Sequence, residues 1–308
     1  MKKKEKTITL EGHEMRLSNL DKLMYPDDGI TKGDVINYYQ RIAEYMLPHT
    51  MNRPISMQRF PDGVGHKGFY QKDASDYFPA FITRVKVPLR EKGKFNEQVC
   101  LNNAASLAYL ANQGVLTSHP WLSRRDKLEY PDRMIFDLDP GKEKDFPHIV
   151  QIARSLRDIC TEIGLFPYPM LTGSKGLHVT IPIIRNLKFA EIKEFARSIA
   201  QIMVLKFPDL LTLELRKGKR KGKIFVDILR NEYGQTAVAP YSLRSLKGAP
   251  IATPLTWNEL DSKSYAQKYT IANIFRRLAR NGDPWENIQM HAVSLKGARK
   301  KLAVMNEA

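Results

Sequence analysis

The chain has 308 residues, 43% hydrophobic and 27% charged, a composition typical of a globular protein with a sizeable core. Its 49 lysines and arginines against 33 acidic residues give a formal charge of +16, which favours a polyanionic partner, most often nucleic acid. No run approaches the roughly 18 apolar residues of a membrane span, no apolar signal segment opens the chain, and two isolated cysteines give no disulfide framework, so we expect an intracellular protein with no membrane partner.

Helical and strand patterns mix in the amino-terminal part of the chain and become clearer from residue 131 onward. Residues 102–113 predict a helix that ends at Gly114, because glycine readily takes the backbone conformation that closes a helix. Residues 134–138 predict a buried strand, and a helix should follow from an N-cap at Asp145 to Gly164. The apolar positions on one face of that helix are Ile149, Ile152, Ala153, Leu156, Ile159, Cys160 and Ile163.

Further strands and a second helix complete the expected core, and their order predicts a mixed α/β fold. Residues 169–171 and 177–184 predict strands joined by a glycine-containing turn. A helix should follow, with its apolar face formed by Ile192, Phe195, Ile199 and Ile202. Residues 224–229 predict a strand, preceded by a loop at 216–223 with six cations in eight residues. The last part of the chain should be peripheral, with the basic run 296–301 as a frayed tail or a phosphate-contacting one.

An apolar segment that ends on two carboxylates is the most informative feature of the sequence. Successive side chains of a strand point to opposite faces, so Asp137 and Asp139 share one face while Phe136 and Leu138 pack behind them. A proline–glycine pair ends the strand and leaves both acids at its open end. A hard cation such as Mg²⁺ or Mn²⁺ would relieve the repulsion between them. The alternative is a solvated strand end.

A third acid, Asp227, falls within the strand predicted at 224–229, on the face opposite Val226 and Ile228. An ionised carboxylate among apolar residues is costly unless it is paired or bound to a metal. A structural salt bridge to Arg230 or Arg244 is one explanation. The other is a metal site, because three acids on strands are able to hold two divalent cations about 3.5–4 Å apart, the arrangement that serves nucleotidyl transfer.

Residues 172–178 form a turn between two strands whose composition suits phosphate. Its glycines let the backbone approach a ligand, its hydroxyls and Lys175 are phosphate-binding groups, and His178 opens the next strand. An ordinary surface loop is the alternative. The basic loop 216–223 is either a solvated hairpin tip or a contact to a nucleic-acid backbone.

Near the amino terminus, Lys22 and Lys32 offer two further cations, and Phe69 and Tyr70 place two aromatic rings beside Lys72. Aromatic rings next to a cation are able to stack a base. Packing in the core is the alternative for the aromatic pair.

Five motifs in this order resemble those of one family: Phe136–Gly141, Thr172–His178, Phe225–Asp227, Leu229–Asn231 and Thr236–Arg244. The chain resembles the polymerase domain of bacterial and archaeal DNA ligase D, a branch of the archaeo-eukaryotic primase superfamily used in non-homologous end joining. The segments around Lys22 and Lys32 and the residues Ser118–Trp121 resemble it too. The resemblance covers about residues 10–290.

The resemblance implies the primase-polymerase fold, mixed α/β, with an α/β module, an RRM-like module and the active site in the cleft between them. We expect residues 1–308 to form a single catalytic domain. Residues 1–130 would make the 5′-phosphate and template contacts, 131–290 would form the catalytic core, and 291–308 would form a basic tail. The chain has no Lys-x-Asp-Gly ligase motif and is too short for a phosphoesterase module, so we expect a stand-alone polymerase.

The implied activity is that of a template-dependent nucleotidyltransferase that fills gaps at DNA double-strand breaks and prefers ribonucleotides. Two divalent cations, Mn²⁺ or Mg²⁺, would support two-metal catalysis with a nucleoside triphosphate as substrate. The implied partners are DNA with broken ends or gaps and a 5′-phosphate, together with Ku and a separate ATP-dependent DNA ligase. The implied location is cytoplasmic, associated with the nucleoid.

The resemblance also assigns roles by motif. The metal ligands would be Asp137, Asp139 and Asp227. The triphosphate would be bound by Ser174, Lys175, His178 and Arg244, with His119 near the nucleotide. The 5′-phosphate of the downstream strand would be bound by Asn19, Lys22 and Lys32. The template would be stacked by Phe69 and Tyr70; the family often has two phenylalanines there, so Tyr70 is a departure.

Two other functions compete with this one. The segment Phe136–Asp139 also resembles the Asp-x-Asp of haloacid-dehalogenase phosphatases, in which the first Asp is a nucleophile. That motif normally lies near the start of its domain with a Thr or Val close behind, whereas Pro140 and Gly141 follow here. A non-catalytic DNA-end-binding module of the same fold is the second alternative, and the presence of all three acids argues against it.

Overall fold

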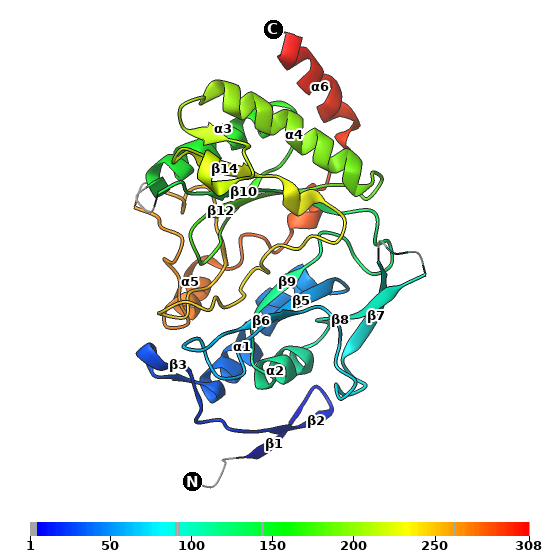
Figure 1. Ribbon diagram of the computed structural model, residues 1–308, viewed down its shortest axis with the longest axis vertical. Helices are drawn as coiled ribbons and strands as arrows, with labels where there is room; N and C mark the ends of the chain where they lie inside the picture. Colours follow the sequence, from blue (N-terminus) through cyan, green and yellow to red (C-terminus); the bar gives the residue numbers. More distant parts are fainter. Residues whose placement is uncertain (1–4, 90, 92, 143–144, 262, 308) are drawn as a thin grey trace. The chain divides into compact units, whose positions relative to one another are not determined.

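A computed structural model of the protein describes residues 5–89, 91, 93–142, 145–261 and 263–307. The chain divides into two compact units: unit 1 contains residues 1–126, 236–252 and 269–277, and unit 2 contains residues 127–235, 253–268 and 278–308. Both units combine helices with β-sheet, which confirms the expected mixed α/β class (Figure 1). Within the described ranges, no helix is long and apolar enough to cross a membrane.

Unit 1 is built on an antiparallel sheet with two helices beside it. The strands are β5 (Pro54–Arg59), β6 (Phe69–Gln71), β7 (Thr83–Pro88), β8 (Phe95–Cys100) and β9 (Val115–Pro120). The helices are α1 (Lys32–Thr50) and α2 (Ala104–Asn112). Two hairpins precede them: β1 (Lys6–Leu10) with β2 (His13–Leu17), and β3 (Leu23–Tyr25) with β4 (Ile30–Thr31), the latter around the short 3₁₀ turn Pro26–Asp28.

Local sequence explains where both helices of unit 1 begin and end. Helix α1 starts at a capping box, in which Thr31 Oγ1 accepts from the Asp34 N–H at 3.2 Å and the Asp34 carboxylate accepts from the Thr31 N–H at 2.8 Å. Helix α2 starts at Asn103, whose side chain accepts from the Ser106 N–H at 2.7 Å. It ends before Gly114, which takes a φ of 77°, so the helix expected at 102–113 is confirmed.

Unit 2 is built on a six-stranded sheet whose order is β13–β14–β10–β12–β11–β15. The strands are β10 (Arg133–Asp139), β11 (Tyr168–Leu171), β12 (Leu177–Pro182), β13 (Leu211–Thr212), β14 (Ile224–Asp227) and β15 (Thr253–Pro254). Only β13 and β14 pair in parallel among these described strands. Helices α3 (Phe146–Glu162) and α4 (Phe189–Lys206) cover one face of the sheet (Figure 1). Helix α6 (Leu295–Glu307) follows near the carboxyl end, and α5 (Ile274–Asn281) begins in unit 1 and ends in unit 2.

The predicted apolar faces of the unit 2 helices largely agree with the structure. All seven apolar residues expected on one face of α3 are buried. Asp145 is the N-cap residue, but its carboxylate accepts from the Lys142 N–H at 2.7 Å and makes no capping bond to the helix. On α4, Ile202 is only partly buried and Met203 is buried instead. An α-helix has 3.6 residues per turn, so positions spaced by three or four residues drift off the buried face and the next residue replaces them.

Three expectations, one for β14 and two for the end of the chain, are wrong. The strand expected at 224–229 ends at Asp227, and the chain then forms a 3₁₀ turn at 229–231. The basic run 296–301, expected as a frayed tail or a phosphate-contacting one, is not frayed: it lies within α6, where Leu295, Ala298 and Leu302 form a buried face. The region after residue 281 is also not peripheral throughout, since Trp285 is fully buried.

Candidate active site

The register of the unit 2 sheet brings the predicted acids to one face. Strand β10 lies between β12 and β14, and Asp137 is directly opposite His178 on one neighbour and Asp227 on the other. Residues directly opposite in an antiparallel pair point to the same face, with Cβ atoms about 4.5–5.5 Å apart. Asp139 lies two residues further along, opposite Phe225, so it shares that face. The face behind it, with Phe136 and Leu138, is fully buried.

Arg230 and His178 both contact the carboxylate of Asp137, on the central strand β10. His178 Nε2 lies 3.3 Å from Asp137 Oδ2, and Arg230 Nε lies 3.2 Å from the same oxygen. Arg230 Nε also lies 3.7 Å from Asp227 Oδ2, while the other oxygen of Asp227 accepts from the Leu229 N–H at 2.7 Å. The salt bridge considered as the structural explanation for Asp227 therefore exists, and its partner is Arg230.

Burial and mutual charge separate the pKa values of the acids. Asp137 is 4% exposed and Asp227 is 8% exposed, so a solvated strand end does not describe this site. Burial opposes the ionisation of Asp137, but His178 and Arg230 outweigh it and lower its pKa to about 2. Burial and the charges of Asp137 and Asp227 raise the pKa of Asp139 to about 6. Burial also raises the pKa of Asp227, despite the nearby Arg230. Such divided shifts within one cluster are typical of functional sites.

The donor set suits a divalent cation, although the side chains are not gathered around one. Carboxylate oxygens are the ligands that Mg²⁺ and Mn²⁺ prefer, and three carboxylate groups share this face. His178 Nδ1 is buried and makes no hydrogen bond to a described residue, which leaves a polar atom for a ligand. Yet within the described ranges no three His, Cys, Asp or Glu side chains form a metal-binding group. The positive charge beside Asp137 and Asp227 is instead the guanidinium of Arg230, which contacts both carboxylates.

The turn at 172–178 is held by its own first residue. Thr172 Oγ1 donates to the Gly176 carbonyl at 3.0 Å and accepts from the N–H groups of Ser174 and Gly176 at 3.3 and 3.2 Å. Gln267 Nε2 donates to the Ser174 carbonyl at 3.0 Å, and a Cβ on Gly176 would come within 2.3 Å of the end of β10. The backbone is thus fixed beside the acids, while the Lys175 side chain is exposed. The Thr172 hydroxyl, expected among the phosphate-binding groups of the turn, bonds to the backbone of the turn instead. Gln267 was not identified from the sequence.

The basic loop 216–223 is partly structural. The Arg220 guanidinium lies 3.8 Å above the Phe225 ring and donates to the carbonyl groups of Glu214 and Leu215, just before the loop. The loop meets the turn after β10 closely, since a Cβ on Gly141 would lie 1.9 Å from the Gly222 carbonyl oxygen. The cations left exposed to solvent are Arg216, Lys217, Lys219 and Lys221.

In unit 1, the three residues predicted to bind a 5′-phosphate come together at the start of α1. Asn19 takes a φ of 55°, and its carbonyl accepts from the Lys22 N–H at 3.0 Å. The Lys32 N–H donates to the Lys22 carbonyl at 2.7 Å, and its Nζ donates to the Ser18 carbonyl at 2.8 Å. Lys22 Nζ pairs with Asp62 Oδ1 at 2.6 Å. Burial and the neighbouring Lys22 lower the pKa of Lys32 to about 8. No pattern in the sequence had pointed to Ser18 or Asp62.

The aromatic pair of unit 1 lies at the surface, so core packing is wrong for it. Phe69 is 47% exposed and Tyr70 is 62% exposed, both on β6. The Arg59 guanidinium lies 5.6 Å from the Phe69 ring centre, and the Tyr70 ring centre lies 5.7 Å from that of His119. Arg244 also belongs to unit 1, whereas the acids and the 172–178 turn belong to unit 2.

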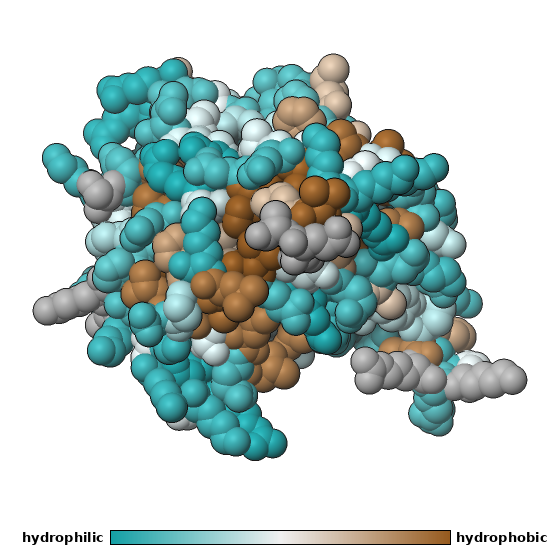
Figure 2. Space-filling view, turned by 90° about the horizontal axis from the view of Figure 1, so that it is seen from above, coloured by the Kyte–Doolittle hydropathy of each residue, from teal (hydrophilic) through white to brown (hydrophobic). Residues whose placement is uncertain are grey.

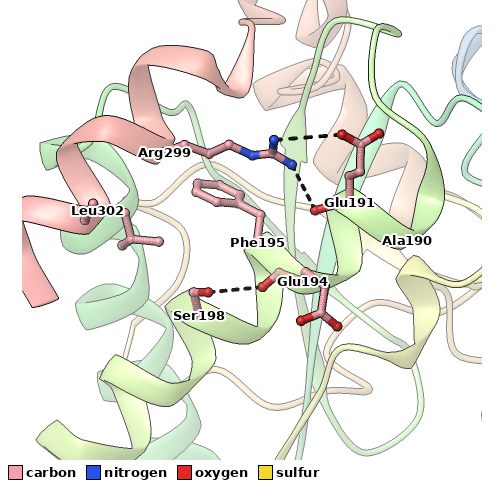
Figure 3. A pocket seen from close by; sticks show the side chains of 8 residues that line it. Ala190, Glu191, Glu194, Phe195, Ser198, Arg299 and Leu302 are labelled. Atoms are coloured by element: carbon pink, nitrogen blue, oxygen red, sulfur yellow. Dashed lines mark hydrogen bonds and ion pairs between the residues drawn. The ribbon is translucent and has the colours of Figure 1, made fainter.

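A pocket of about 520 Å³ lies between α4 and α6 of unit 2, and none of the predicted site residues lines it (Figure 3). Arg299 pairs with Glu191 at 3.9 Å, and the Ser198 hydroxyl donates to the Glu194 carbonyl at 3.2 Å. Figure 2, viewed from the top of Figure 1 where α6 lies, shows an apolar area surrounded by hydrophilic side chains. The pocket is lined by Ala190, Glu191, Glu194, Phe195, Ser198, Arg299, Leu302 and Ala303. Since these polar groups bind one another and none is a predicted site residue, the pocket is not the candidate site.

The sequence is similar to a known protein family and to curated proteins of several bacteria. Residues 31–285 match the family model described as LigD, primase-polymerase domain. The multifunctional non-homologous end joining DNA repair protein LigD of Mycobacterium tuberculosis is 34% identical over 284 residues, which cover 90% of this chain and 37% of that protein. The bifunctional LigD of Bacillus subtilis is 30% identical over 274 residues, covering 88% of this chain and 44% of that protein. The chain therefore spans less than half the length of these curated relatives.

A solved structure agrees with the sequence comparison. The polymerase domain from Mycobacterium tuberculosis ligase D, solved in complex with DNA, matches with a TM-score of 0.83 and 33% sequence identity. The match covers 90% of this chain and 98% of that one. These findings confirm the resemblance drawn from the motifs and the primase-polymerase fold that it implied. The chain belongs to the family of LigD primase-polymerase domains.

Proposed function

We propose that the chain is a template-dependent nucleotidyltransferase that fills gaps at DNA double-strand breaks in non-homologous end joining and prefers ribonucleotides. The observation that supports this most is the alignment of Asp137 with Asp227 and His178 on three neighbouring strands, beside the turn at 172–178. Nucleotidyl transfer requires carboxylates that hold metal ions beside a phosphate-binding turn, and this member of the family has both on one face of its sheet.

In this proposal Asp137, Asp139 and Asp227 hold two divalent cations, Mn²⁺ or Mg²⁺. When bound, the cations would lower the pKa of the primer 3′-hydroxyl and neutralise charge on the triphosphate. The protein's part is to keep the three carboxylates on one face of a paired sheet, so that the strands that carry them need not move when the cations bind.

The nucleotide would be bound by groups of the 172–178 turn, with Arg244 and His119 as the further candidates that the family motifs name. The exposed ammonium of Lys175 and the hydroxyl of Ser174 suit the phosphates, and the fixed backbone of the turn positions both. His178 would face the triphosphate through its unpartnered Nδ1. Arg244 would supply a further fixed positive charge, and His119 would lie near the nucleotide.

The DNA would be bound by the residues of unit 1. Asn19, Lys22 and Lys32 converge in front of α1, where a 5′-phosphate would meet two ammonium groups. Phe69 and Tyr70 are exposed and free of the core, as stacking on a template base requires. The DNA in the complex of the mycobacterial domain and the formal charge of +16 agree with such a partner.

We extend the proposal to organisation and partners. Residues 1–308 would act as one catalytic domain, with DNA contacts in 1–130, the catalytic core in 131–290 and α6 within the segment 291–308. Ku and a separate ATP-dependent DNA ligase would act on the same ends, and the protein would work in the cytoplasm at the nucleoid.

Primer extension on a gapped duplex with a 5′-phosphate tests the proposal. The protein, Asp137→Ala and the surface control Asp158→Ala would each receive ribo- or deoxynucleotides with Mn²⁺ or Mg²⁺. We expect templated addition that Asp137→Ala abolishes and Asp158→Ala keeps, with ribonucleotides added faster. No addition under any condition while DNA still binds would support the non-catalytic end-binding module instead. Release of phosphate without incorporation would support a phosphatase.

A further inference from the structure

One guanidinium nitrogen is shared by two of the predicted metal ligands. Arg230 Nε lies 3.2 Å from Asp137 Oδ2 and 3.7 Å from Asp227 Oδ2. These carboxylates sit directly opposite each other on adjacent strands, so their negative charges repel unless a cation stands between them. Arg230 supplies that cation from within the chain.

The backbone that carries Arg230 is fixed to the same strand as Asp137. The next residue, Asn231, is fully buried, and its amide donates to the carbonyl groups of Ile135 at 2.7 Å and Ile228 at 2.9 Å. Its Oδ1 also accepts from the Ile135 N–H at 2.9 Å. Since a buried amide with three hydrogen bonds resists displacement, the short turn after β14 keeps Arg230 beside the acids.

The side chain of Arg230, in contrast, has a path to solvent. It is 36% exposed, while the Asp137 and Asp227 side chains that it contacts are 6% and 11% exposed. The long arginine side chain is therefore able to turn outward while its backbone and the two carboxylates stay in place. A divalent cation and a guanidinium cannot occupy the same space between Asp137 and Asp227.

We propose that Arg230 is a resident counter-cation of this site: it neutralises Asp137 and Asp227 in the metal-free protein, and a divalent cation must displace it to bind. Arg230 is then a positioning residue that sets the affinity for metal through the carboxylates. The inference rests on the proposed function, because it assumes that these carboxylates bind metal.

The test measures metal binding and needs no polymerase activity. Mn²⁺ would be titrated into the protein, Arg230→Gln and Arg230→Lys, with unbound Mn²⁺ followed by electron paramagnetic resonance. If the guanidinium fills the site about 90–99% of the time, its removal should tighten Mn²⁺ binding roughly 10- to 100-fold. Lysine keeps the positive charge but lacks the planar guanidinium, so the Mn²⁺ affinity of Arg230→Lys should lie between those of the unmodified protein and Arg230→Gln.

A second measurement separates this role from a merely structural one. Without metal, Arg230→Gln should lower the melting temperature, because two buried carboxylates lose their cation, and Mn²⁺ should restore it. Arg154→Gln is the matched control: Arg154 is also partly buried in unit 2, where it donates to the carbonyl groups of Trp257 and Leu260. Its loss should lower the melting temperature without rescue by Mn²⁺ and leave Mn²⁺ affinity unchanged.

The outcomes distinguish failure of the inference from failure of the proposed function. Equal Mn²⁺ affinity in the protein and Arg230→Gln, with weaker binding in Asp139→Ala, would overturn the role of Arg230 and leave the metal site standing. Absence of saturable Mn²⁺ binding in all of these proteins would remove the metal site, and the inference with it.

Discussion

Gly176 allows a quantitative test of how the 172–178 turn positions its side chains. An ideal Cβ on Gly176 would stand 2.3 Å from the Leu138 carbonyl oxygen and 3.4 Å from Asp139 Oδ1. A close carbon–oxygen contact settles at about 3.3 Å, so alanine would force a displacement of about 1 Å. Leu138 belongs to β10, which is paired on both sides, so the turn should move and the strand should stay.

Gly176→Ala should therefore impair nucleotide use more than folding. A misplacement of about 1 Å costs on the order of 10²-fold in rate, and overpacking costs about 1–3 kcal/mol of stability. We expect kcat/KM for nucleotide addition on gapped DNA to fall by that factor, with DNA affinity unchanged. Chemical denaturation would measure the change in the free energy of unfolding.

Gly297→Ala is the control, because a Cβ there meets nothing within 4 Å and the residue lies in α6. Alanine in a helix should raise the free energy of unfolding by about 0.5–1 kcal/mol and leave activity unchanged. A Gly176→Ala protein with the kcat/KM of the unmodified protein would refute the reasoning, since the turn would then not need its present position.

Two further predictions concern the proposed 5′-phosphate site. Lys22→Ala should abolish the tighter binding of gapped DNA with a 5′-phosphate over the same DNA with a 5′-hydroxyl, measured by fluorescence anisotropy; an unchanged preference would exclude Lys22 from the site. The same preference should depend on pH through Lys32, whose pKa burial and Lys22 lower to about 8. Below that pH the ammonium is charged and above it the charge is lost, so the preference should decline between about pH 7 and 9. In Lys32→Arg the decline should disappear because arginine stays protonated; a decline that persists would assign it to another group.

Sequence patterns predicted the local features of the site well. The two-residue period of a strand placed Asp137 and Asp139 on one face, and the proline–glycine pair marked the end of β10. The pairing of Asp137 with Asp227 was out of reach, because strand register depends on hydrogen bonds between segments about 90 residues apart. For the same reason the sequence offered Arg230 and Arg244 equally as partners of Asp227.

The main misreading, at the carboxyl end, has a physical cause. The cations around α6 hide an apolar face made of Leu295, Ala298 and Leu302, which recurs at helical spacing. High local charge suggested a frayed or phosphate-contacting tail, but these three buried residues at helical spacing pack the helix against its unit. An exposed aromatic pair cannot be told from a buried one in sequence, so the exposure of Phe69 and Tyr70 could be established only from the structure.

The antiparallel ladder of β10 with β14 also determines which kinds of sequence change this chain tolerates. Exchanging one apolar residue for another behind the strands alters packing but leaves Asp137 and Asp227 opposite each other. Inserting or deleting a single residue within β14 would turn Asp227 to the opposite face, toward the helices. Length variation among relatives should therefore concentrate in the loop before β14, and the four residues of the strand itself should keep their number.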